Sequence, residues 1–227
     1  MLLDYIRSGD MEGVIIGLLV SAFVVFCTLP IHEYAHALVA TKLGDDTPRL
    51  QGRLTLNPMA HIDIMGALMI LLVGFGYAKP VQVNARRFKN PKGGMALTAL
   101  AGPVSNVLMA FIFCILGNVI RIAAASNGAS PLINAAYMFT SIAAQINASL
   151  AVFNLLPIPP LDGSKLLALV IPAKYYFKYL KYERYIITVV FALILFGVLS
   201  VPLSFLSGLL LKGVSFVAEL PFIALLG

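Results

Sequence analysis

An apolar stretch without basic residues near the start of the chain constrains the fold more than any other feature. Residues 13–41 contain no Lys or Arg, and Glu33 is their one acidic residue. A helix of this length extends about 43 Å at about 1.5 Å per residue, more than the roughly 30 Å hydrocarbon core of a bilayer. We therefore expect a membrane-spanning helix from about Met11 to Leu43, ended by Gly44.

The composition supports an integral membrane protein. Of the 227 residues, 60% are hydrophobic and 11% are charged, whereas soluble domains carry about 25% charged residues. The net charge of +6 could suggest a nucleic-acid partner. We expect no nucleic acid, because the basic residues lie between apolar segments, as in the cytoplasmic loops of membrane proteins. The chain is interpreted as a single membrane domain, residues 1–227, in a bacterial plasma membrane.

Further apolar segments extend the fold. Four more helices are expected at about 94–122, 132–156, 185–200 and 203–220. The apolar run within 62–80 is short and broken by glycines, which favours a re-entrant segment over a crossing. Alternating residues at 53–56 and 81–84 predict short strands. The expected fold is an all-α polytopic membrane protein with about five transmembrane helices, a re-entrant segment and short membrane-associated β-strands.

The basic residues favour this topology. If 62–80 does not cross, the loops at 42–63, 77–93 and 157–184 share one side. They carry Lys42, Arg49, Arg53, Lys79, Arg86, Arg87, Lys89, Lys92, Lys165, Lys174, Lys178, Lys181 and Arg184. The other side keeps only Arg7 and Arg121, and Lys212 lies within the last expected helix. Cytoplasmic loops are enriched in Lys and Arg, so we expect the basic side to be cytoplasmic.

The motif HEYAH, residues 32–36, interrupts the first apolar helix. His32 and His36 are four residues apart and therefore share one helix face, which suits two nitrogen ligands of one zinc ion. Glu33 could reach a water at that metal, which makes the segment an H-E-x-x-H motif. The alternative is that these polar groups only pack against other helices. An unpaired ionisable group in lipid costs at least about 2.5–3.5 kcal/mol, which favours metal binding.

A catalytic zinc site usually has three protein ligands and one open position. Asp162 is the best candidate for the third ligand, because it follows the proline-broken end of a helix in NLLPIPPLDG. Irregular backbone of this kind is tolerated at membrane depth only where protein or water surrounds it. The alternative is a turn residue before Gly163, or the N-cap of the short helix expected at about 164–171.

These motifs resemble those of the site-2 protease family of intramembrane zinc metalloproteases. HEYAH and the run from Asn154 to Gly163, which fits N-x-x-P-x-x-x-x-D-G, carry the resemblance over about residues 30–165. AGPVSN, with Asn106, is similar to the family's middle motif. We expect a short form without a PDZ or CBS domain.

The resemblance implies one zinc ion per chain, held by His32, His36 and Asp162, with Glu33 activating water. It also implies that Asn154 steadies the substrate backbone or the oxyanion. Asn106 is a possible substrate-binding residue that could instead join two helices.

The resulting hypothesis is an enzyme that hydrolyses peptide bonds of transmembrane protein substrates within or near the bilayer, with its active site near the cytoplasmic face. A metal-binding membrane transporter and a catalytically inactive membrane scaffold are the alternatives. His61 could be a further ligand, although a loop histidine bonded to Asp63 is favoured. The tyrosines between 175 and 185 are interpreted as an interfacial aromatic belt with lysine partners.

Overall fold

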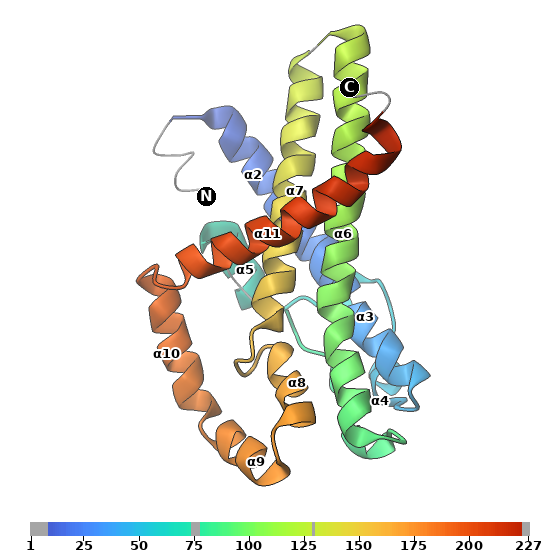
Figure 1. Cartoon of the computed structure of the whole chain (residues 1–227), viewed down its shortest axis with the longest axis vertical. Coiled ribbons are helices and arrows are strands. Elements are labelled where there is room, and N and C mark those ends of the chain that lie inside the picture. The colour runs from blue at the N-terminus through green and yellow to red at the C-terminus, as the bar shows by residue number, and fades with distance from the viewer. Residues whose placement is uncertain (1–8, 74–77, 129, 224–227) are drawn as a thin grey trace.

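The computed structural model describes residues 9–73, 78–128 and 130–223, and these residues fold into helices joined by irregular segments. Three long segments form the bundle seen in Figure 1, with shorter helices gathered towards one end. The short helical elements of the first half are α4 (Thr47–Leu50), η2 (Pro58–Ala60), α5 (Ile64–Val73) and η3 (Ala85–Arg87). The last element is η4 (Leu220–Phe222).

The first span is continuous but changes its helical period. It consists of α2 (Met11–Phe23), the π-helical turn η1 (Val24–Thr28) and α3 (Leu29–Lys42). Together they form an apolar helix of 32 residues. The π turn was not predicted, and it lies directly before the helix that carries HEYAH, a position typical of functional sites. Gly44 ends the helix with a φ of 106°, a conformation that favours glycine.

The next two spans, α6 (Pro91–Asn127) and α7 (Pro131–Leu155), form an antiparallel pair (Figure 1). Each begins with a side-chain cap. Asn90 accepts a hydrogen bond from the Gly93 amide, and Ser130 accepts one from the Ile133 amide. The interior between the helices contains many small residues. Ala110, Ala143, Ala144, Ala148 and Ala151 are all buried. Small residues let helix backbones approach closely in a membrane, and this brings the polar side chains of neighbouring helices together.

The C-terminal part contains α8 (Gly163–Val170), α9 (Ala173–Lys181), α10 (Glu183–Leu195) and α11 (Ser200–Glu219). The prediction of two crossings here, at 185–200 and 203–220, is not confirmed. With 13 residues, α10 extends only about 20 Å, which is short of the bilayer core.

The end of α11 lies beside the C-terminal part of α6. Asn118 Nδ2 donates to the Ala218 carbonyl at 3.2 Å, and Arg121 lies 3.8 Å from Glu219. In Figure 1, α10 rises from α9 and α11 continues across α6 and α7 towards that same end. Among the described residues, four helices are therefore long and apolar enough to cross a membrane, instead of the five that were expected.

The segment expected to be re-entrant returns to its starting point. The Lys79 amide donates to the His61 carbonyl at 2.8 Å, and Arg53 donates to the carbonyls of Ala60 and Lys79. Between these ends, α5 has 10 residues, too few to cross the bilayer. Residues 74–77 of this segment lie outside the described residues. A chain that enters and leaves at one place has the geometry that a re-entrant segment requires.

The short strands expected at 53–56 and 81–84 are not formed. In both segments, described throughout, backbone amides are bonded to acceptors other than a neighbouring strand. The Arg53 amide donates to the Pro48 carbonyl at 2.8 Å. The Val81 amide donates to Glu33 and the Asn84 amide donates to Asp45. Alternating residues favour an extended backbone, but these carboxylates replace the strand partner that a β-ladder needs.

Candidate metal centre

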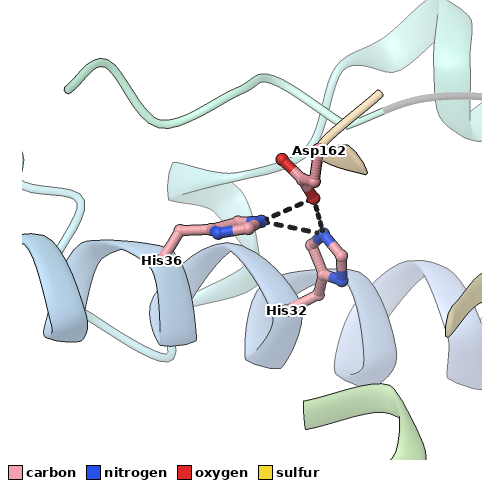
Figure 2. Close-up of side chains that lie close together, drawn as sticks. All are labelled: His32, His36 and Asp162. Atoms are coloured by element: carbon pink, nitrogen blue, oxygen red, sulfur yellow. Dashed lines mark hydrogen bonds and ion pairs between the residues drawn. The ribbon is translucent and has the colours of Figure 1, made fainter. Parts of the chain in front are cut away.

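Three ligand-type side chains meet in the interior, from two segments far apart in the sequence (Figure 2). His32 and His36 project from one face of α3, and Asp162 lies directly before α8. The two Nε2 atoms are 3.0 Å apart. Asp162 Oδ2 lies 2.9 Å from Nε2 of His36 and 3.3 Å from Nε2 of His32. All three residues are buried. The short distances show that the structure brings the three predicted ligands together.

The outer ring nitrogens fix how the two imidazoles are protonated. His32 Nδ1 lies 2.8 Å from Asn106 Oδ1, and His36 Nδ1 lies 2.7 Å from the Thr98 carbonyl. Both partners can only accept, so both Nδ1 atoms carry the hydrogen, and in neutral rings the Nε2 lone pairs face inward. Metal-binding histidines are typically held in this way by a second hydrogen bond.

The donor set fits a metal ion. Ligands about 2.0–2.1 Å from a tetrahedral zinc ion are about 3.3 Å from one another, close to the observed separations. Two lone pairs and a carboxylate oxygen pointing at one another repel unless a cation lies between them. His32, His36 and Asp162 could therefore hold one metal ion.

Two glycines make this convergence possible. A Cβ at Gly102 would lie 2.5 Å from His32 Nε2 and would also collide with His36 Nε2. The backbone of α6 therefore packs directly against the two imidazole rings. A Cβ at Gly163 would collide with the carbonyl oxygens of Leu155 and Leu156. Glycine at this position allows the tight bend that carries the chain from α7 to Asp162.

Asp162 occupies the N-cap position of α8, but its side chain makes no capping hydrogen bond. Its Oδ2 faces the two histidines, and its Oδ1 accepts a hydrogen bond from Lys165 Nζ at 2.9 Å. The alternative interpretation of Asp162 as a helix cap is therefore correct for the backbone and not for the carboxylate. Lys165 was not among the predicted site residues, although it lies one helical turn after Asp162.

The Glu33 carboxylate is buried and is held by the segment that follows the re-entrant region. Its Oε2 accepts a hydrogen bond from the Val81 amide at 3.0 Å. Glu33 follows His32 on α3 but is not one of the three converging ligand-type residues. It is therefore placed beside the cluster as a separate carboxylate.

A second buried carboxylate, which sequence reasoning did not identify, holds the other end of the same segment. Asp45 accepts hydrogen bonds from the Asn84 amide at 2.6 Å and from the amide of Thr47 at 3.0 Å. Burial disfavours the charged form, but the hydrogen bonds from Thr47 and Asn84 and the nearby Arg87 hold the pKa of Asp45 below its ordinary value. Glu33 and Asp45 thus fasten residues 81–84 alongside α3.

The two predicted site asparagines, Asn106 and Asn154, have different surroundings. Asn106 is 1% exposed and bonds to His32, and its Nδ2 has no hydrogen-bond partner among the described residues. Asn154 Nδ2 donates to the Leu150 carbonyl of its own helix at 3.0 Å. Asn106 therefore contacts a candidate ligand directly, whereas Asn154 faces back along α7.

His61 is fully buried outside the cluster. Its Nε2 donates to the Thr55 carbonyl at 2.8 Å, so its partner is Thr55 and not the expected Asp63. This bond holds the loop before α5 together. Among the described residues, the group of converging ligand-type side chains does not include His61.

Histidines four residues apart on a membrane-spanning helix, with a carboxylate from a distant segment, define a class of membrane proteins with an H-E-x-x-H metal site. The family model of peptidase family M50 matches residues 20–197. This match covers most of the 227 residues, so the chain belongs to peptidase family M50, and the resemblance to the site-2 proteases is confirmed.

Curated relatives agree with this family. The chain is 46% identical over 147 residues to "Putative zinc metalloprotease YwhC" of Bacillus subtilis, covering 62% of this chain and 64% of that protein. It is 28% identical over 165 residues to "Putative zinc metalloprotease Rip2" of Mycolicibacterium smegmatis, covering 70% and 59%. It is 31% identical over 137 residues to "Putative zinc metalloprotease MJ0611" of Methanocaldococcus jannaschii, covering 60% and 62%.

The matches span about three fifths of the length of these relatives. No solved structure matches the chain significantly.

Proposed function

We propose that this chain is a zinc metalloprotease that hydrolyses peptide bonds of membrane-protein substrates within or near the bilayer, as in regulated intramembrane proteolysis. The observation that carries the proposal is the convergence of the two Nε2 atoms and Asp162 Oδ2 within 3.3 Å of one another. The membership in peptidase family M50 and the names of the relatives support it.

His32, His36 and Asp162 would hold one zinc ion and leave one position open. A zinc ion held there would polarise the scissile carbonyl and lower the pKa of a water molecule towards about 7. Glu33 accepts the proton of the attacking water and passes it to the leaving nitrogen, which is the role of the acid in H-E-x-x-H. Its Oε2 accepts a hydrogen bond from the Val81 amide at 3.0 Å, which holds the carboxylate beside the cluster.

Three other groups orient the ligands. Asn106 holds the His32 ring, the Thr98 carbonyl holds the His36 ring, and Lys165 holds Oδ1 of Asp162. Because Oδ1 is engaged by Lys165, only Oδ2 faces the histidines. Each ligand thus approaches the centre with one atom, which leaves a position open for water and substrate.

Asn154 is proposed to stabilise the oxyanion or to hold the substrate backbone. Its amide now donates to the Leu150 carbonyl one turn earlier. Rotation of the half-buried side chain would exchange this bond for one to the substrate. An amide donor at a developing oxyanion is worth about 2.7–4 kcal/mol in other hydrolases.

The site is proposed to open towards the cytoplasm. The segments that carry most of the basic residues join the ends of α3, α6 and α7 that lie towards α8 and α9 (Figure 1), and Asp162 directly precedes α8. Basic loops stay on the cytoplasmic side. Four apolar helices place the protein in lipid, so the accessible substrates are segments of other membrane proteins.

The test is cleavage of a transmembrane protein by the purified chain in lipid nanodiscs. The account predicts cleavage that is lost on chelation, restored by zinc, and absent in Glu33→Gln. Transport of zinc without cleavage would favour a metal transporter. Zinc binding with neither activity across a panel of transmembrane substrates would favour a scaffold. Either outcome would contradict the proposed protease.

A further inference from the structure

A shallow, open hollow at the junction of α9 and α10 combines cationic, acidic, hydroxyl and apolar side chains. It has a volume of about 470 Å³, and it is called the junction hollow below. Its lining residues are Leu180, Lys181, Glu183, Arg184, Ile187 and Thr188. The hollow lies outside the metal centre and plays no part in the proposed hydrolysis.

The two cations of the junction hollow differ from several others in the chain. Arg87, Arg121 and Lys165 each face an acidic side chain within 3.9 Å. Lys181 and Arg184 are exposed and form no ion pair with any acidic side chain of the described residues. Glu183 also lines the hollow, so its three charged side chains carry a net charge of +1. Lys181 and Arg184 are therefore free to bind an anion.

The surrounding surface extends this positive charge. Lys174, Lys178 and Lys181 are exposed and follow one another at intervals of four and three residues, so they form one stripe along α9. Tyr182 is 48% exposed and Tyr185 is 69% exposed beside the hollow. Tyrosine and lysine together are typical of the level of the lipid headgroups.

The chemistry of the junction hollow changes along α10. Arg184 lies at the start of the helix and Ile187 lies one turn further on. The helix then continues through apolar residues towards α11 (Figure 1). Leu180 adds an apolar side chain from α9. A phospholipid has the same order, with an anionic phosphate followed by an acyl chain. An acidic peptide has no need of the apolar part.

We propose that the junction hollow binds an anionic phospholipid, with Lys181 and Arg184 at its phosphate and Leu180 and Ile187 against its acyl chain. The binding is connected to the metal centre. Tyr179 Oη donates to the Pro157 carbonyl at 2.7 Å, in the segment that leads to Asp162. A lipid that holds α9 therefore also stabilises the irregular segment that positions the carboxylate.

The test uses the full chain in nanodiscs of equal parts phosphatidylglycerol and phosphatidylcholine. Lipid retained after detergent extraction is counted by mass spectrometry. The expected result is about tenfold enrichment of phosphatidylglycerol, because each Lys or Arg near an anionic lipid strengthens binding severalfold. The double variant Lys181→Gln/Arg184→Gln should lose the enrichment. The control, Arg86→Gln/Lys89→Gln, removes the same charge from an exposed loop and should keep it.

Zinc content of each variant reports whether the fold is intact. Equal enrichment in wild type and Lys181→Gln/Arg184→Gln would overturn the proposal, and so would an equal loss in the control. Binding of a polyglutamate probe to the hollow, without preference between the two lipids, would assign it to a protein partner and also overturn the proposal.

The connection to the metal centre has a separate readout. Hydrogen exchange at the amides of Leu161 and Asp162 should be slower in phosphatidylglycerol than in phosphatidylcholine alone. Tyr179→Phe should remove this difference while keeping the lipid enrichment. Exchange that is the same in both lipids would show that the hollow binds lipid without affecting the Asp162 segment.

Discussion

The amide oxygen of Asn106 lies 2.8 Å from His32 Nδ1, and this contact joins α6 to α3 in the buried interior. It fixes the ring so that Nε2 points to Asp162 and His36. We therefore propose that Asn106 is a positioning residue that would act on a bound metal through His32.

Asn106→Ala should lower zinc affinity by about 10–100-fold, as expected when a residue that orients a ligand is lost. Competition with a chelator measures this affinity without any need for activity. Asn118→Ala is the matched control, because Asn118 is also a buried α6 asparagine but bonds to the Ala218 carbonyl instead. Equal affinities of the two variants would contradict the positioning role.

Gly102→Ala should abolish zinc binding, because the new methyl group would occupy the space of the two imidazoles. Gly117→Ala is the control. Gly117 lies on the same helix, and the atom nearest to a new Cβ there is 3.5 Å away, an ordinary contact. Zinc content should therefore fall in the first variant only. Full zinc content in Gly102→Ala would show that α6 does not back the metal centre as closely as described.

Asp45 makes stability depend on acid pH. Its folded-state pKa is below the ordinary value of 3.8, so its stabilising effect is fully present above about pH 4 and is lost as pH falls through the folded-state value. Asp45→Asn should reduce this acid-dependent loss of thermal stability. The exposed neighbour Asp46 provides the control. An unchanged pH profile in Asp45→Asn, with a changed one in Asp46→Asn, would contradict this role.

The local parts of the metal centre could be predicted from the sequence. Four-residue spacing places His32 and His36 on one helix face wherever that helix lies. The prolines before Asp162 predict an irregular segment free to turn. The N-termini of α6 and α7 can also be predicted, because Asn90 and Ser130 are capping residues and a proline follows each of them.

Other parts depend on contacts between distant segments. The alternation at 81–84 favours a strand, but Glu33 and Asp45 supply the hydrogen-bond acceptors there. The role of Asn106 depends on the packing of α6 against α3. The sequence predicted two helices, at 185–200 and 203–220. The structure instead begins α11 at Ser200 and turns the chain near Gly197, which has a φ of 71°.

The proposed topology predicts which cysteines a membrane-impermeant reagent can reach. In a chain lacking Cys27 and Cys114, a single cysteine at Lys89 or Lys178 should react only after the membrane is permeabilised. A cysteine at exposed Ser126, near the far end of α6, should react in intact cells. Labelling at position 89 in intact cells would place the basic loops outside and contradict a site that opens towards the cytoplasm.

Zinc analysis of purified variants decides whether three side chains hold one metal ion while Glu33 acts beside it. The account predicts one zinc ion per chain in wild type and in Glu33→Gln. It predicts little zinc in Asp162→Ala and in His36→Ala, because each removes one of three ligands. Full zinc content in Asp162→Ala, or loss of zinc from Glu33→Gln, would contradict the account.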